Sequence, residues 1–154
     1  MLREELGDFC SITCFKSLIV GMEEALGEKV IGIALTTSGR YRGKKLGQEL
    51  GLENLSISWE LLADKLGFAL GKNGTSLCII NKIIEEDKLI KVYTSETLCS
   101  AGEAQGSNRK CNFTLGVIWG ALEVFTGQNL QGKQIESVLR NGSHDVFEFT
   151  ILDK

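Results

Sequence analysis

The sequence contains no proline, only one histidine and no long apolar run. Without proline the chain has no rigid linker, so its elements must end at glycines and polar turns. The longest apolar stretches, such as residues 115–122, are too short to span a bilayer. The five cysteines have no disulfide-framework spacing, and the first residues lack the apolar segment of a signal peptide. We therefore expect a cytoplasmic protein with free thiols, without a transmembrane segment.

The charge of the chain bears on a further class of function, nucleic-acid binding. The net charge is −3, and no long basic tract is present, so nothing in the sequence indicates a nucleic-acid partner. The length of 154 residues is enough for one sizeable core, and no composition shift marks a boundary. We therefore expect a single domain over residues 1–154.

Glycine is abundant and regularly spaced. Within residues 29–52, which otherwise have a helical pattern, four glycines recur one turn apart: Gly39, Gly43, Gly47 and Gly51. A glycine inside a helix costs about 0.5–1 kcal/mol relative to alanine, so another backbone or a ligand must approach this stripe closely to offset the cost. Gly116 and Gly120 repeat the spacing in the apolar segment 113–126. Helix–helix packing alone is the favoured explanation, and a buried slot between the helices is the alternative.

The remaining pattern predicts the element order α-α-α-β-β-α-β-β. Helices are expected at residues 8–26, 29–52, 57–70 and 111–126, and strands at 76–85, 89–95, 134–140 and 146–152. Asp8 and Ser56 are the expected N-caps of the first and third helices, and the Asn141-Gly142 pair is a strong hairpin signal. The sequence thus predicts an α+β domain with a four-stranded antiparallel sheet of two hairpins and helices on one face. Its two open edges favour dimerisation.

The residues that could act in catalysis or bind a metal have simpler structural explanations. His144 lies at the expected turn, where a solvated histidine is favoured over a catalytic base. Cys10 and Cys14 lie on one helical face, and buried structural thiols are favoured there over a soft-metal site. No two acids can be paired for acid–base work. We therefore expect no catalytic residue and no metal site, and an enzyme is the less favoured interpretation.

Basic residues gather beside the glycines of the second helix. They are Arg40, Arg42, Lys44 and Lys45. This cluster could receive the carboxylates of an amphiphilic ligand, although a solvated helix face is the favoured explanation.

The C-terminal half has the most specific pattern. It contains CNFTLGVIWGALEVFTG at 111–127, QIES at 134–137 and NGSHDVFEFTI at 141–151. These motifs resemble the 4-vinyl-reductase-type (hydrocarbon-binding) domain, in which a cysteine opens a Gly-xxx-Gly helix that is followed by two strands. The segment SGRYRGKKLG at 38–47 is similar to a glycine-repeat segment of that family. The resemblance covers residues 32–152.

The resemblance implies a fold shared with vesicle-tethering (TRAPP-type) subunits, commonly dimeric and enclosing an apolar cavity. It also implies binding of a small hydrophobic molecule, as in aromatic-sensing regulators or proteins linked to pigment synthesis and photosystem assembly in photosynthesis. Family members with a zinc site take thiolates from the helix-opening cysteine and from the last two strands. Cys111 matches the first of these, but no cysteine follows it. We therefore predict no zinc site and no cofactor.

The leading hypothesis is a non-enzymatic domain that binds a tetrapyrrole, an isoprenoid or an acyl chain. The residues expected to bind this ligand are Ile33, Arg40, Arg42, Leu46, Leu66, Phe113, Ile118 and Phe125. Lys44 is a further candidate at the mouth of the cavity. The rival hypothesis is an assembly scaffold that works through its surface, as a homodimer or with a protein partner. A tetrapyrrole reductase ranks last because the sequence has no cofactor motif.

Overall fold

The computed structural model describes residues 2–153. Within this range the elements are α1 (Ile12–Leu26), α2 (Glu28–Glu49), α3 (Trp59–Leu70), β1 (Ile79–Glu86), β2 (Leu89–Ser95), α4 (Asn112–Thr126), β3 (Leu130–Glu136), the 3-10 helix η1 (Val138–Arg140) and β4 (Asp145–Ile151). The predicted α+β class and element order are confirmed. None of the helices in the described range has the length and apolarity needed to cross a membrane.

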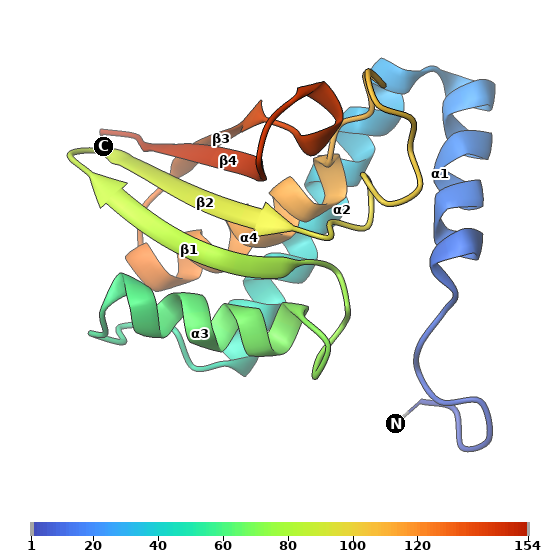
Figure 1. Cartoon of the computed structure of the whole chain (residues 1–154). Helices are drawn as coiled ribbons and strands as arrows, with labels where there is room; N and C mark the ends of the chain where they lie inside the picture. Colours follow the sequence, from blue (N-terminus) through green and yellow to red (C-terminus); the bar gives the residue numbers. More distant parts are fainter. Residues whose placement is uncertain (1, 154) are drawn as a thin grey trace.

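The four strands form one antiparallel sheet in the order β1-β2-β4-β3. The register places Val92 opposite Phe147 and Ile90 opposite Phe149, and all four side chains are fully buried. On the other face Lys91 lies opposite Glu148. Helices α3 and α4 therefore cover one face of the sheet, α2 packs on α4, and α1 is outermost (Figure 1).

The glycine stripes form the contact between α2 and α4. A Cβ atom on Gly43 would collide with the carbonyl of Val117, and one on Gly120 would collide with the carbonyl of Arg40. The two backbones thus touch, which offsets the cost of helical glycine. This is the favoured packing explanation, and the described residues leave no slot between the two helices at these positions. The fourth glycine of the stripe, Gly51, was wrongly placed in the helix: α2 ends at Glu49, and Gly51 has φ +64°.

Two helices begin later than the sequence predicted. Helix α1 is capped by the hydroxyl of Ser11, not by Asp8, whose carboxylate accepts hydrogen bonds from the backbone N–H groups of Leu2 and Arg3. Helix α3 is capped by Ser58, not by Ser56. In both cases a polar residue nearer the first turn reaches the unpaired N–H groups, so a competing cap a few residues upstream is not used.

Strand limits also differ from the prediction. Strand β1 begins at Ile79, and β3 covers Leu130–Glu136 in place of 134–140. The chain then forms η1, and Asn141 adopts a left-handed conformation with φ 64° at the predicted turn. The hairpin of β3 and β4 is antiparallel as expected, but its connection is a longer loop than an Asn-Gly turn.

Helix α1 contributes little to the core. Ile19 is its one buried residue, while Phe9, Ile12 and Leu18 of the expected apolar face are 67%, 45% and 57% exposed. The predicted burial of Cys10 and Cys14 is wrong, because both thiols are exposed. The predicted apolar face of this segment is therefore only partly buried, because Phe15, Ile19 and Met22 are buried or half-buried while the other members are exposed.

Candidate functional site

An open cleft of about 1340 Å³ lies beside α2. Its walls are the first half of α2, the loop 107–110, the start and middle of α4, the end of strand β3, and the N-cap and last residue of η1, Ser137 and Arg140. Glu23 at the end of α1 closes one corner. The cleft thus lies alongside the α2–α4 contact, because Gly32, Thr36 and Arg40 line the cleft and also face the backbone or side chains of α4.

Three large apolar side chains line this cleft. Ile33 of α2 is 63% exposed and Ile135 of β3 is 44% exposed. Trp119 of α4 is half-buried and contacts Phe149 edge-on, with ring centres 6.2 Å apart. These side chains offer a ligand apolar surface that the protein itself does not cover.

Two residues that line the cleft, Arg40 and Trp119, bond to the buried Glu123, which lies outside the cleft lining. The Arg40 guanidinium lies 4.9 Å from the Trp119 ring centre and donates from Nε to Glu123 Oε2 at 2.9 Å. Glu123 also accepts hydrogen bonds from Trp119 Nε1 and from the backbone N–H of Leu130, both at 3.2 Å, and pairs with Lys44 at 3.3 Å. Burial raises the pKa of Glu123, but the bonds and charges of these partners outweigh it and lower the pKa below its usual value.

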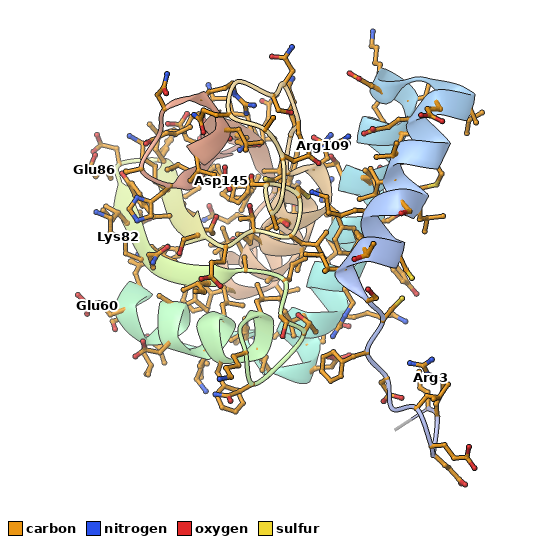
Figure 2. All side chains as sticks on the ribbon, turned by 45° about the vertical axis from the view of Figure 1, so that its right-hand side comes forward. Arg3, Glu60, Lys82, Glu86, Arg109 and Asp145 are labelled. Carbon is orange, nitrogen blue, oxygen red and sulfur yellow. The ribbon has the colours of Figure 1, made fainter. Side chains whose placement is uncertain are left out.

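Ion pairs join α1 to the loop that forms the opposite wall. Arg109 Nη1 lies 2.7 Å from Glu23 Oε1, and Lys16 Nζ lies 2.8 Å from Glu103 Oε1. Figure 2 shows Arg109 in the loop on the side of the body that faces α1. The hydrogen bond from Lys16, together with the charge of Arg109, lowers the pKa of Glu103 despite its partial burial. These contacts hold the end of α1 at the cleft.

A buried polar cluster lies behind the cleft floor, centred on Asp145 at the start of β4 (Figure 2). Its carboxylate accepts hydrogen bonds from Thr97, from Ser100 at 2.8 Å and from Gln134 at 3.2 Å. Gln134 also lines the cleft, and its Oε1 accepts from the backbone N–H of Cys111 at 3.0 Å. The cluster thus fixes the start of α4 relative to the sheet.

Three buried thiols surround this cluster. Contact with Cys111 and burial raise the pKa of the Cys99 thiol, and burial raises the pKa of Cys78 to about 12. No group of three or more histidines, cysteines and acids among residues 2–153 is arranged to hold a metal ion. The hydrogen bonds from Thr97, Ser100 and Gln134 satisfy the buried carboxylate of Asp145.

His144 lies outside the cleft. Its Nδ1 is 2.9 Å from Ser143 Oγ, and its ring contacts Tyr93 edge-on. The cleft lining in the described part of the chain includes no histidine and no cysteine. The arrangement in the cleft can bind and orient a molecule through apolar contacts, ammonium and guanidinium groups and side-chain amides.

The structure brings two of the eight expected ligand-binding residues into the cleft, Ile33 and Arg40. Arg42 lies elsewhere and pairs with Glu49 at 3.1 Å. Leu46, Leu66 and Ile118 are buried in the closed core. The expected set therefore does not line one common cavity.

The two aromatic members of the set lie at opposite ends of α4. Phe113 contacts Phe15 of α1 edge-on, with ring centres 5.5 Å apart. Phe125 contacts Trp59 of α3 and borders a smaller pocket of about 540 Å³ that Lys44 also lines.

Sequence reasoning missed Trp119, Glu123 and Asp145. Glu123 is the one charged residue of α4, and Trp119 precedes it by one turn. A lone acid in an apolar helix needs a buried partner, so this pair was a usable signal. Asp145 had no comparable signal, because two of its partners, Thr97 and Ser100, lie 48 and 45 residues away in the sequence.

No family model matches the chain, and no curated protein matches it. Solved structures do share its fold. The phenol-responsive sensory domain of the transcription activator PoxR, solved with phenol, has a TM-score of 0.73 at 10% identity over 94% of this chain and 76% of that one. Subunit 3 of a trafficking protein particle complex from Naegleria fowleri, covalently bound to palmitic acid, has a TM-score of 0.64 at 15% identity over 92% of this chain and 93% of that one. The expected fold relation to tethering subunits and aromatic-sensing regulators is therefore confirmed at the level of fold.

Proposed function

We propose that this chain is a non-enzymatic binding domain for a small hydrophobic molecule, and that the cleft beside α2 is its site. The observation that carries the proposal is that the exposed Ile33 and Ile135 and the half-buried Trp119 line one concave surface. Binding sites for small molecules are concave and combine apolar walls with a few polar groups. The proposed site retains Ile33 and Arg40 from the sequence prediction and adds Trp119 and Ile135.

The two structural neighbours support this proposal by analogy. One was solved with phenol and the other with covalently bound palmitic acid, so this fold accommodates apolar ligands in those proteins. A tetrapyrrole, an isoprenoid and an acyl chain remain the candidate ligand classes. The volume of about 1340 Å³ is large enough for any of them.

Binding of a neutral naphthylamine fluorescent probe to the full chain tests the proposal. Ile33→Ser removes apolar surface from the cleft and should weaken probe binding about tenfold, because burial of an isoleucine contributes roughly 1.5–3 kcal/mol. Phe68→Ser is the matched control, since Phe68 is 65% exposed, lies on α3 and is outside the cleft. A chain that binds no probe, or equal loss in both variants, would contradict the proposal.

A surface role is the second candidate, supported by α1 and the segment before it. Leu2, Phe9 and Leu26 are 94%, 67% and 62% exposed, and exposed large apolar side chains are candidate interaction sites. In this role the chain forms a homodimer or binds an assembly partner. Concentration-dependent sedimentation that Leu18→Glu abolishes would support the role, and a monomer at all concentrations would count against the homodimer.

A further inference from the structure

Helices α2 and α4 run parallel, which gives the cleft two different ends. Gly32 faces Asn112, Gly43 faces Val117, and Gly47 faces Val124, so positions advance together along both helices. The N-termini of α2 and α4 therefore lie at the same end of the cleft. Neither N-terminus has a side-chain cap, whereas α1 and α3 are capped by Ser11 and Ser58.

Cationic side chains without carboxylate partners gather at this same end. Of the cations that line the cleft, Arg40 is paired with Glu123 and Arg109 with Glu23. Among the described residues, no carboxylate lies within ion-pair distance of the other three, which are Lys29, Lys110 and Arg140. Lys29 is in the first turn of α2 and Lys110 directly precedes the start of α4. Arg140 donates to the carbonyls of Ser107 and Arg109 in the adjacent loop.

Two carboxylates also line the cleft near these cations. Glu136 already accepts a hydrogen bond from the backbone N–H of Ser143 at 2.9 Å, and Glu28 lies in the first turn of α2. Three unpaired cations and two uncapped helix ends still leave the local potential positive.

The apolar wall begins beside this cationic end, at Ile33 and Ile135, and continues along the cleft to Trp119. From Lys29 to Arg40, α2 rises about 17 Å, and Ile33 and Trp119 line this length. A pure hydrocarbon filling the whole cleft would remove water from the ammonium groups and from the amides of Asn108 and Asn112 without offering them an acceptor. A ligand with an anionic head group and an apolar body would satisfy both parts.

We propose that the cleft binds an amphiphilic anion, with its head group at Lys29, Lys110 and Arg140 and its apolar body along Ile33, Trp119 and Ile135. This inference rests on the proposed function and specifies the class of ligand. A carboxylate and a phosphate monoester share the required chemistry.

Displacement of the neutral naphthylamine probe from the full chain tests this assignment, with decanoate, decyl phosphate and decanol as competitors. Decanoate or decyl phosphate should bind at least about tenfold more tightly than decanol, and added salt should reduce that advantage. The better of the two anions identifies the head group. Each of Lys29→Gln, Lys110→Gln and Arg140→Gln should weaken anion binding about two- to fivefold and leave decanol binding unchanged.

Lys72→Gln is the matched control, because Lys72 is an exposed lysine outside the cleft. Equal binding of decanol and both anions would overturn the anionic assignment while the proposed function stands. Loss of anion binding in Lys72→Gln to the same extent as in Lys110→Gln would also overturn it, since the effect would then be nonspecific charge. Failure of all three competitors, together with failure of the probe to bind, would overturn the proposed function as well.

Discussion

The two sides of α2 differ in how closely they approach the rest of the chain. On the side that faces α4, Gly39 and Gly43 bring two backbones into contact, and a single added carbon atom does not fit. On the adjoining side, Ile33 and Arg40 border an open cleft of about 1340 Å³ that α4 also lines through Asn112 and Trp119. One helix therefore carries a stability surface and a candidate binding surface that are close in sequence. Substitutions on the side that faces α4 should change stability, and substitutions in the cleft should change binding.

The largest effect is expected on the closed side. Gly43→Ala should lower the free energy of unfolding by about 3 kcal/mol or more, because the new Cβ meets the backbone of α4, which cannot move aside. Gly21→Ala is the control, since a Cβ at Gly21 in α1 meets nothing. That substitution should raise stability by about 0.5–1 kcal/mol. Urea unfolding followed by circular dichroism measures both, and equal effects would contradict backbone contact.

A slightly smaller effect is expected at the buried cluster behind the cleft floor. Asp145→Ala should cost about 2–3 kcal/mol, because it leaves Ser100, Gln134 and the backbone N–H of Val138 without their acceptor. Asp64→Ala on the exposed face of α3 should change stability by less than about 0.5 kcal/mol. If Asp145→Ala left the free energy of unfolding unchanged, the cluster would not hold α4 to the sheet.

Glu123 connects the two sides, because it lies in α4 and binds the cleft residue Arg40. Its folded-state pKa lies below the ordinary 4.5, so the ionised carboxylate stabilises the fold above that pH. This contribution is lost as pH falls through the folded-state pKa. Glu123→Gln should cost about 1–2 kcal/mol at neutral pH, and its stability should converge with that of the parent chain below pH 4.5. A constant difference across pH would contradict this role.

The last prediction concerns the reactivity of the cysteine thiols and involves no change in stability. Cys10 and Cys14 are exposed and should react rapidly with a thiol reagent in the native state. Cys78, Cys99 and Cys111 are buried, and the raised pKa values of Cys78 and Cys99 slow them further. We expect them to react only on unfolding. Mass spectrometry of timed alkylation gives the order, and early labelling of Cys99 would contradict the burial described here.

Local signals in the sequence predicted the order of elements well. Strand β2 matches the predicted residues 89–95, and α4 ends at Gly127 as expected, because hairpin and C-cap signals act over a few residues. Helix starts were less predictable, since several polar residues compete for one cap. The sequence predicted close packing of the two glycine-containing helices but not which positions meet, which only the tertiary arrangement defines.

The candidate site was predictable only in part for the same reason. Ile33 and Arg40 were found because they lie beside the glycine stripe of α2. Leu46 and Ile118 were expected to line the same cavity, yet both lie in the closed core. The loop 107–110 and η1 complete the cleft through contacts between distant segments, which sequence periodicity does not report. The cytoplasmic location and the dimer remain predictions.

The two tryptophans allow the most direct test of the cleft as the binding site. Trp119 lines the cleft, whereas Trp59 lies on α3, and its indole donates a hydrogen bond to Glu85 of β1 at 2.8 Å. The neutral naphthylamine probe is added to the full chain labelled with nitrogen-15, and a nitrogen–proton correlation spectrum is recorded. The indole N–H resonance of Trp119 should shift, and that of Trp59 should stay in place. A shift confined to Trp59, or no shift at saturating probe, would contradict the account.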